Sequence, residues 1–263
     1  MTTKVLVSGS GKMGREVLEA ICRENDMDPV GCVDYLSTEE YISIRGSELI
    51  PFGQDAAAMI ARVRPDVIVD FTNAEWTPRL AKDALEAGVR LVIGTTGLDE
   101  AFLRELQADS AKRGVGVLVA PNFAMGAVLM ESMARIASRY YSHAEIIELH
   151  HDGKVDAPSG TSLATARAMA EGRGQPFISP APKRQALAGT RGGQEGGVNI
   201  HSVRLPGLVA HHEVIFGAPG ETLTIRHDTS HRESFMPGVI LAIREVMKSQ
   251  DYTYGLDRLL GLT

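Results

Sequence analysis

Short apolar runs alternate with amphipathic stretches through the first half of the chain. Runs typical of buried strands occupy residues 4–8, 30–33, 66–71, 90–93 and 115–119. Stretches with helical spacing of apolar residues follow three of these runs, at residues 15–24, 76–87 and 99–113. Continuous apolar strands separated by helices predict a parallel sheet that helices cover on both faces.

The pattern changes after a helical stretch at residues 125–140. Strand-like segments then follow one another with one clear helix among them, at residues 144–151, 198–205, 212–216 and 222–227. Such a run of strands predicts a second domain of the α+β class with a mixed or antiparallel sheet. The glycine-rich residues 189–197 predict a flexible loop.

A last helical stretch, residues 236–247, carries Pro237 near its first turn, where proline is tolerated. We expect this helix to return to the first domain, because its apolar stripe would stay uncovered in the second. The predicted domains are residues 1–122 plus 233–263, for dinucleotide binding, and residues 123–232, for substrate binding and oligomerisation.

A glycine-rich motif follows the first predicted strand. The motif is G-x-G-x-x-G over residues 9–14, a helical stretch follows it, and Asp34 ends the next strand twenty residues after Gly14. The three glycines permit a tight turn, a close approach of backbone to a pyrophosphate and helix–strand packing, while the acid accepts hydrogen bonds from a ribose. The first domain is therefore predicted to be a Rossmann-type dinucleotide-binding domain.

Further candidate cofactor residues lie where the other predicted strands end. Ligands of open parallel sheets bind at the carboxyl ends of the strands, so five segments are expected to line one edge. The candidate cofactor-binding residues at this edge are Gly9, Ser10, Gly11, Lys12, Met13, Gly14, Asp34, Phe71, Thr72, Gly94, Thr95, Thr96, Ala120, Pro121, Asn122 and Phe123.

Residues 145–161 carry the candidate chemistry of the second domain. His150 and His151 close a predicted strand, Lys154 follows on a turn, and residues 158–161 open a helical pattern. Free N–H groups and the dipole at a helix N-terminus favour an anion. Proton donors beside such a helix start suit a carboxylate substrate that must be protonated.

Other interpretations of these residues stay open. Successive strand residues point to opposite faces, so His150 and His151 share a face only if the strand ends or bulges there. Ser159 fits a helix N-cap better than a nucleophile, because no activating base stands in the motif. Glu148 fits an orienting partner of a histidine. No metal site is expected, since zinc sites prefer separated ligands and neither cysteine lies near the histidines.

Composition narrows the possible partners. The net charge is −6, which argues against nucleic acid. No run approaches the roughly 18 apolar residues that span a bilayer, and the first residues lack the apolar region of a secretion signal. Cys22 and Cys32 are the only cysteines, which favours a reducing cytoplasm over a disulfide framework.

With these motifs in hand, the chain resembles the 4-hydroxy-tetrahydrodipicolinate (dihydrodipicolinate) reductase family of lysine and diaminopimelate synthesis. The most specific match is E-x-x-E-x-H-H-x-x-K-x-D-A-P-S-G-T over residues 145–161, and the resemblance covers essentially the whole chain. Supporting matches are residues 11–14, 70–72, 94–97, 120–123 and 201–204, with Arg232 and Phe235. The resemblance implies a Rossmann domain plus a tetramerising α+β domain, and reduction of a cyclic imine dicarboxylate by NADH or NADPH.

The resemblance also implies roles for individual residues. His150 corresponds to the proton donor, Lys154 to the catalytic lysine and His151 to a substrate contact. Gly160 and Thr161 correspond to the cradle of a substrate carboxylate, and we expect the amide of Ser159 to contribute to it. Arg232 and Phe235 join the cofactor-binding set.

The residue after Asp34 bears on the choice between NADH and NADPH. Tyr35 follows Asp34 where some members carry an arginine for a 2′-phosphate, so we expect NADH to be preferred and NADPH still used, with Lys12 in reach of a phosphate.

The alternative functions are those of another two-domain Rossmann reductase and of a non-catalytic dinucleotide sensor. An aspartate-semialdehyde dehydrogenase needs a thiol nucleophile in its second domain, and no cysteine follows Cys32.

Overall fold

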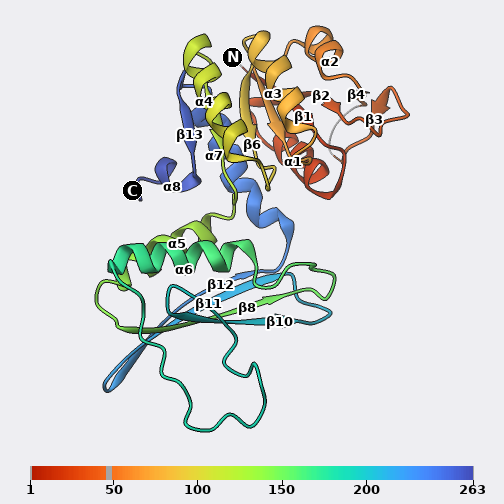
Figure 1. The fold of residues 1–263 in the computed structure, drawn as a ribbon. Coiled ribbons are helices and arrows are strands. Elements are labelled where there is room, and N and C mark those ends of the chain that lie inside the picture. Colours follow the sequence, from red (N-terminus) through yellow and green to blue (C-terminus); the bar gives the residue numbers. More distant parts are fainter. Residues whose placement is uncertain (1, 46–48, 263) are drawn as a thin grey trace. The chain divides into compact units, whose positions relative to one another are not determined.

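The computed structural model describes residues 2–45 and 49–262. The chain forms two compact units, one of Met1–Met125 with Phe235–Thr263 and one of Gly126–Ser234. Each unit has its own sheet (Figure 1). The two units are described separately below.

Unit 1 is built on an eight-stranded sheet within the described residues. Its strand order is β13-β7-β6-β5-β1-β2-β4-β3. All neighbours are parallel except β3 and β4. The strands are β1 (Thr3–Ser8), β2 (Met27–Val33), β3 (Tyr41–Ile42), β4 (Ile50–Gly53), β5 (Val67–Asp70), β6 (Arg90–Ile93), β7 (Val117–Val119) and β13 (Tyr252–Tyr254).

Helices cover this sheet because its strands are apolar on both faces. Apolar residues of α2, α3 and α4 pack with residues such as Ile68 and Leu91 in one buried cluster. Helices α1 and α7 contact each other, and α7 also contacts β6 and β7. The helices of unit 1 are α1 (Lys12–Cys22), α2 (Ala56–Val63), α3 (Thr77–Glu86), α4 (Glu100–Arg113), α7 (Met236–Val246) and α8 (Leu256–Leu259).

Unit 1 confirms the predicted parallel sheet and corrects several elements. Helix α1 begins at Lys12, three residues before the predicted start, so Lys12, Met13 and Gly14 are helical. Sequence reasoning missed α2, although Asp55 caps it by accepting a hydrogen bond from Ala58 N at 2.8 Å. It also missed the short strands β3, β4 and β13, which have too few residues to show a period.

Unit 2 carries a five-stranded mixed sheet in the order β12-β11-β8-β10-β9. The β8–β10 pair is parallel, and the other neighbours are antiparallel. The elements of unit 2 are α5 (Met125–Ala137), β8 (His143–His150), α6 (Gly160–Arg173), β9 (Gly193–Glu195), β10 (Val198–Arg204), β11 (Ala210–Ala218), β12 (Glu221–Thr229) and the 3-10 helix η1 (Arg232–Phe235). The predicted mixed sheet of the second domain is therefore present.

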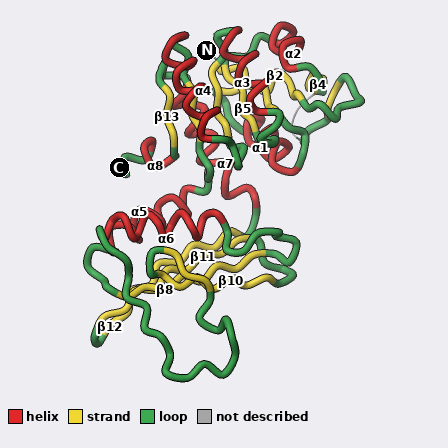
Figure 2. Tube along the Cα trace, viewed as in Figure 1, coloured by secondary structure: helices red, strands yellow, loops and turns green. Residues whose placement is uncertain are grey.

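Helices α5 and α6 lie over one face of this sheet (Figure 1). Met130 of α5 and Met169 of α6 pack against Ile146 and Phe216 of the sheet in a buried core. A long loop connects α6 to the region of β9 and β10 (Figure 2). The prediction of loop for all of residues 189–197 is wrong, because Gly193–Glu195 pairs with β10 as β9.

Candidate functional site

The glycine motif of unit 1 forms a turn that side chains would block. Gly9 has φ of +103°, and a Cβ on it would lie 2.8 Å from the Phe71 carbonyl oxygen. A Cβ on Gly14 would lie 1.8 Å from the Gly9 oxygen, so only glycine lets α1 approach the turn. At Gly11, the N-cap of α1, a Cβ would meet nothing within 4 Å. No side chain caps this helix start, and its first turn is free of acidic residues. The turn therefore fits a bound pyrophosphate.

Backbone hydrogen bonds join the strand-end segments of unit 1 into one edge. Phe71 N donates to Ser8 O at 3.1 Å, and Gly94 N donates to Asp70 O at 2.8 Å. Ala120 N donates to Ile93 O at 3.0 Å. Because each bond continues the parallel ladder, the segments after β1, β5, β6 and β7 are adjacent, as the fold predicts.

Aromatic side chains fill this edge between the strand ends. The rings of Phe71 and Phe123 make an edge contact, with centroids 5.5 Å apart. A Cβ on Gly94 would lie 2.1 Å from the Phe71 ring, so glycine is required for the ring to lie there. Asn122 Oδ1 accepts from Ala124 N at 2.9 Å and shapes the turn after β7.

Asp34 already has hydrogen-bond partners in unit 1. Its Oδ2 accepts from the Ser10 amide at 2.8 Å and from the Ser10 hydroxyl at 2.7 Å, and its Oδ1 accepts from Leu36 N at 3.0 Å. Burial raises the pKa of Asp34, but these hydrogen bonds outweigh burial and lower the pKa below its usual value. The glycine loop is therefore tied to an ionised carboxylate.

In unit 2, His150 is the last residue of β8 and pairs through Nδ1 with Glu148. Glu148 is fully buried, and the Arg204 guanidinium donates to both of its oxygens, at 2.9 and 2.8 Å. Burial raises the pKa of Glu148, but hydrogen bonds from His150, Arg204 and Ser202 outweigh burial and lower it to about 2. A carboxylate therefore orients the histidine ring, as the sequence suggests for Glu148.

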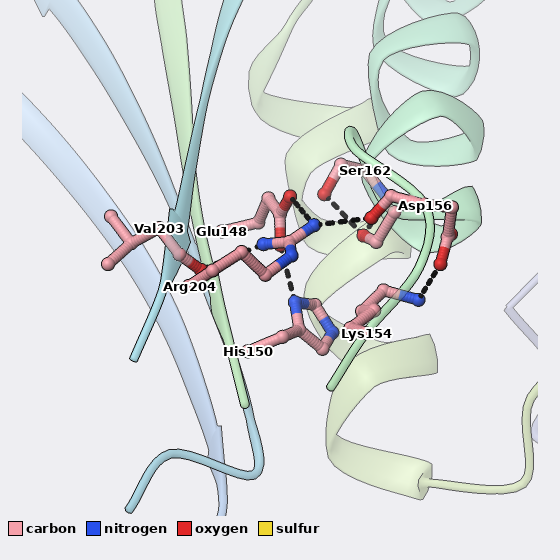
Figure 3. Close-up of polar contacts among 8 residues, drawn as sticks. Glu148, His150, Lys154, Asp156, Ser162, Val203 and Arg204 are labelled. Carbon is pink, nitrogen blue, oxygen red and sulfur yellow. Dashed lines mark hydrogen bonds and ion pairs between the residues drawn. The ribbon is translucent and has the colours of Figure 1, made fainter. Parts of the chain in front are cut away.

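Arg204 also reaches the loop that carries Lys154. Its Nη2 donates to the Asp156 carbonyl at 2.7 Å, and Lys154 Nζ donates to the Asp156 carboxylate at 2.6 Å. Figure 3 shows the Arg204 guanidinium between Glu148 and this loop, with His150 and Lys154 near it. One guanidinium thus connects the partners of both predicted catalytic side chains.

Helix α6 begins directly after this loop. Ser159 is its N-cap and accepts from Ser162 N at 3.2 Å, as the sequence predicts. The Ser159 and Ser162 hydroxyls are 2.8 Å apart and buried. A Cβ on Gly160 would meet nothing within 4 Å. Amides in the first turn of a helix, here including those of Gly160 and Thr161, lack partners within the helix and can receive an anion.

Not every predicted site residue joins these two groups. His151 lies just beyond the end of β8 in a turn, where Lys154 N donates to its carbonyl at 3.2 Å. Thr96 lies in the turn after β6. Arg232 and Phe235 are the ends of η1, where the chain passes from unit 2 back to unit 1.

Sequence reasoning missed the structural roles of three polar residues, which are Arg204, His212 and Asp70. Arg204 appeared only within a family match, and its role depends on the pairing of β8 with β10. His212 begins the predicted strand 212–216; it is buried opposite Glu148, and burial lowers its pKa to about 4. Asp70, an acid that ends an apolar strand, is fully buried. The position of Asp70 within an apolar run could have indicated a buried carboxylate.

Among residues 2–45 and 49–262, no group of three or more His, Cys, Asp or Glu side chains is arranged to hold a metal ion. In the same part of the chain, no helix combines the length and the apolar character needed to cross a membrane.

Comparisons with known proteins address the whole chain. Residues 3–123 match the model of the dihydrodipicolinate reductase N-terminus, and residues 126–260 match that of the C-terminus. The 4-hydroxy-tetrahydrodipicolinate reductase of Dehalococcoides mccartyi is 48% identical over 261 residues, which is 98% of each chain. That of Bacillus subtilis is 42% identical over 266 residues, again 98% of each.

Solved structures give the same result. Dipicolinate-bound dihydrodipicolinate reductase from Paenisporosarcina sp. TG-14 has a TM-score of 0.87 and 38% identity, and the match covers 98% of this chain and 99% of that one. An amine dehydrogenase from Mycobacterium smegmatis, at 15% identity and a TM-score of 0.65 over 98% of this chain and 96% of that one, shares the fold. The chain belongs to the dihydrodipicolinate reductase family.

Proposed function

We propose that this protein reduces 4-hydroxy-tetrahydrodipicolinate (dihydrodipicolinate) to tetrahydrodipicolinate with NADH or NADPH, in diaminopimelate and lysine synthesis. Family membership supports the reaction, and the residues present fit it. The observation that carries the proposal is the Arg204 guanidinium, which connects the carboxylate that orients His150 to the residue that holds Lys154.

Unit 1 is the proposed cofactor-binding domain. The open space at Gly11 and the uncapped start of α1 fit a pyrophosphate, and Asp34 fits a ribose. The segments at Phe71 and Thr72, at Gly94 to Thr96 and at Ala120 to Phe123 fit the nicotinamide and its ribose. When bound, the cofactor supplies a hydride to ring C4 of the substrate.

Unit 2 is the proposed substrate-binding domain, and His150 is its proton donor. Hydride addition at C4 of the substrate moves an electron pair to C3 of the substrate. C3 then takes a proton from the imidazole of His150. Because Nδ1 faces Glu148, the proton leaves from Nε2. Lys154 assists this protonation. Water leaves the 4-hydroxy precursor before hydride addition, because its loss forms the conjugated imine that accepts the hydride at C4. General acid catalysis of this kind contributes typically about 10²–10⁴-fold.

The start of α6 is the proposed seat of one substrate carboxylate. The amides of Ser159, Gly160 and Thr161 would bind it, with Lys154 and His151 supplying side-chain contacts. The hydroxyl of Ser159 is engaged with Ser162, so Ser159 contributes through its backbone. The reductase from Paenisporosarcina sp. TG-14, which is described as dipicolinate-bound, supports a small dicarboxylate ligand.

NADH is the proposed preferred cofactor, with NADPH still used. Asp34 is ionised and repels a 2′-phosphate, and Tyr35 adds no positive charge. The Ser10 amide and hydroxyl, now on Asp34, are donors that a phosphate can also use, and Lys12 is exposed at the start of α1. These groups limit the discrimination against NADPH.

A cytoplasmic homotetramer joined through the sheet of unit 2 is the proposed assembly. Helices α5 and α6 cover one sheet face, and the opposite face carries Ile147, Leu149 and Ile215, which are only partly buried. Burial of such a face favours association. Sedimentation at micromolar concentration should show the tetramer, and a monomer alone would contradict it.

The reaction is tested by NAD(P)H oxidation with substrate made in situ. The preceding synthase would make the substrate from pyruvate and aspartate semialdehyde, and oxidation should require both the synthase and this protein. Failure with both cofactors would favour another Rossmann reductase or a dinucleotide sensor. Binding of NADH without turnover would single out the sensor.

A further inference from the structure

Asp70, at the end of β5, is a fully buried carboxylate that accepts hydrogen bonds from hydroxyl groups. Its Oδ1 accepts from the Thr72 hydroxyl at 2.7 Å, and its Oδ2 accepts from the hydroxyls of Thr77 at 2.6 Å and Thr95 at 2.8 Å. These donors come from the segment after β5, the start of α3 and the segment after β6. The carboxylate therefore joins three elements.

The Thr95 hydroxyl has two roles in this network. It gives its proton to Asp70, so its oxygen is free to accept, and it accepts from the Thr72 amide at 2.9 Å. Thr95 is only 5% exposed, so its hydroxyl contacts other groups of the protein rather than solvent. Asp70 thus holds Thr72 twice, directly through the hydroxyl and indirectly through Thr95.

Thr72 in turn lies against the glycine loop. A Cβ on Gly9 would be 3.1 Å from Thr72 Cγ2 and 2.8 Å from the Phe71 carbonyl oxygen, so loop and segment are in close contact. A displacement of Thr72 would therefore change both the turn that fits the pyrophosphate and the segment proposed to face the nicotinamide ribose.

We propose that Asp70 is a positioning residue for the dinucleotide. It sets the Thr95 hydroxyl, and through it the Thr72 backbone, in the conformation that receives the cofactor. This inference rests on the proposed function, in that unit 1 binds a nicotinamide dinucleotide.

Thr77 provides a matched control within the same network. Thr77 and Thr95 donate to the same oxygen of Asp70, but Thr77 belongs to α3, and its hydroxyl also lies 3.0 Å from the Asn73 carbonyl. Removing either hydroxyl takes one donor from Asp70. Only the loss of the Thr95 hydroxyl also releases the Thr72 amide.

The experiment measures NADH binding by its fluorescence, without substrate, in the wild type, T95V, T95S, T77V and D70N. We expect T95V and D70N to raise the Kd for NADH about tenfold, some 1.4 kcal/mol, with T95S staying within about threefold of the wild type. T77V should lower the melting temperature about as much as T95V while leaving the Kd within about twofold. In the coupled assay, T95V should raise the KM for NADH more than T77V does.

Equal loss of affinity in T77V and T95V would overturn the proposal, because it would reveal a general loosening of the unit. Wild-type affinity in both T95V and D70N would overturn it as well. If T95V does not fold, T95A and T77A make the same comparison. A wild-type protein that binds neither NADH nor NADPH would instead contradict the proposed function.

Discussion

Asp70 in unit 1 and Glu148 in unit 2 are both fully buried carboxylates, but their partners differ in charge. Asp70 accepts from three neutral hydroxyls, whereas Glu148 accepts from a guanidinium and an imidazole. Charge-assisted hydrogen bonds are roughly twice as strong as neutral ones. The neutral network holds backbone segments together, and the charged network holds side chains that we propose to transfer protons.

This difference follows from what each unit offers its proposed ligand. In unit 1 the groups proposed to contact the ligand are amides, glycines and small hydroxyl residues. Binding there therefore depends on how exactly the backbone is positioned. Unit 2 offers His150 and Lys154, which have long or rotatable side chains and need fixed partners to keep one orientation. Variants at each network can test this contrast.

The first prediction removes the proposed proton donor. H150Q should lower kcat about 10²–10⁴-fold, because the general acid is lost, while the Kd for NADH stays at the wild-type value. Steady-state kinetics and NADH fluorescence measure the two quantities. H143Q, a change of the exposed histidine at the other end of β8, is the matched control and should keep full turnover. Unchanged turnover in H150Q would remove His150 from its role.

The second prediction compares the stability of the two carboxylate networks. R204M leaves Glu148 buried without its cation, and breaking a buried ion pair costs about 3–5 kcal/mol. T77V removes one neutral hydrogen bond to Asp70 and should cost only about 0.5–1.5 kcal/mol. Urea unfolding followed by circular dichroism measures both changes. Equal costs would show that the charge of the partner does not matter here.

The third prediction concerns acid stability. Burial lowers the pKa of His212 to about 4, below its ordinary 6.5, so its neutral form stabilises the fold above pH 6.5. That contribution is lost as the pH falls from 6.5 to 4, and it amounts to about 3 kcal/mol. The lowered pKa of Glu148, about 2, adds a further loss only below its ordinary value of 4.5. H212N should flatten the fall of the unfolding free energy between pH 6.5 and 4.5, and an unchanged slope would contradict this.

The fourth prediction concerns the start of α6. G160V should raise the KM for the dicarboxylate more than about tenfold, because a side chain would occupy the space proposed for the carboxylate. The fold should survive, since a Cβ there meets nothing within 4 Å. G193V, at another glycine with open space, is the control. A normal KM in G160V would place the anion elsewhere.

The fifth prediction concerns cofactor choice. Replacing Asp34 by Ser and Tyr35 by Arg should shift the preference toward NADPH by about tenfold in kcat/KM, some 1.4 kcal/mol. The reason is that repulsion by the carboxylate is replaced by a cation. Kinetics with both cofactors measure the shift. A wild-type protein that already favours NADPH by more than about tenfold would show that Lys12 outweighs Asp34.

Sequence patterns predicted most of the fold, and the errors have physical causes. Strand β6 matches its predicted residues, because three apolar residues follow Arg90 and clear turn signals stand on both sides. Helix α1 begins earlier than predicted, because Gly14 inside it looked like part of the loop but is needed for packing against Gly9. Strand β9 was missed, because its glycine-rich sequence is held by pairing with β10 rather than by propensity.

The two candidate sites were predictable to different degrees. The glycine turn, the strand ends and the run from His150 to Thr161 can be identified from the sequence, because each is local and has a fixed spacing. The end of β8 at His150, which decides how the two histidines are directed, is visible only in the structure.

Local patterns were enough to predict the two-part architecture, the glycine turn and the candidate proton donors His150 and Lys154 before a helix start. The partners of the buried carboxylates became visible only in the folded chain. Arg204 lies 56 residues from Glu148, and Thr95 lies 25 residues from Asp70. The physical reason is that these pairs depend on which strands are neighbours and in what register, and local spacing carries no information on either.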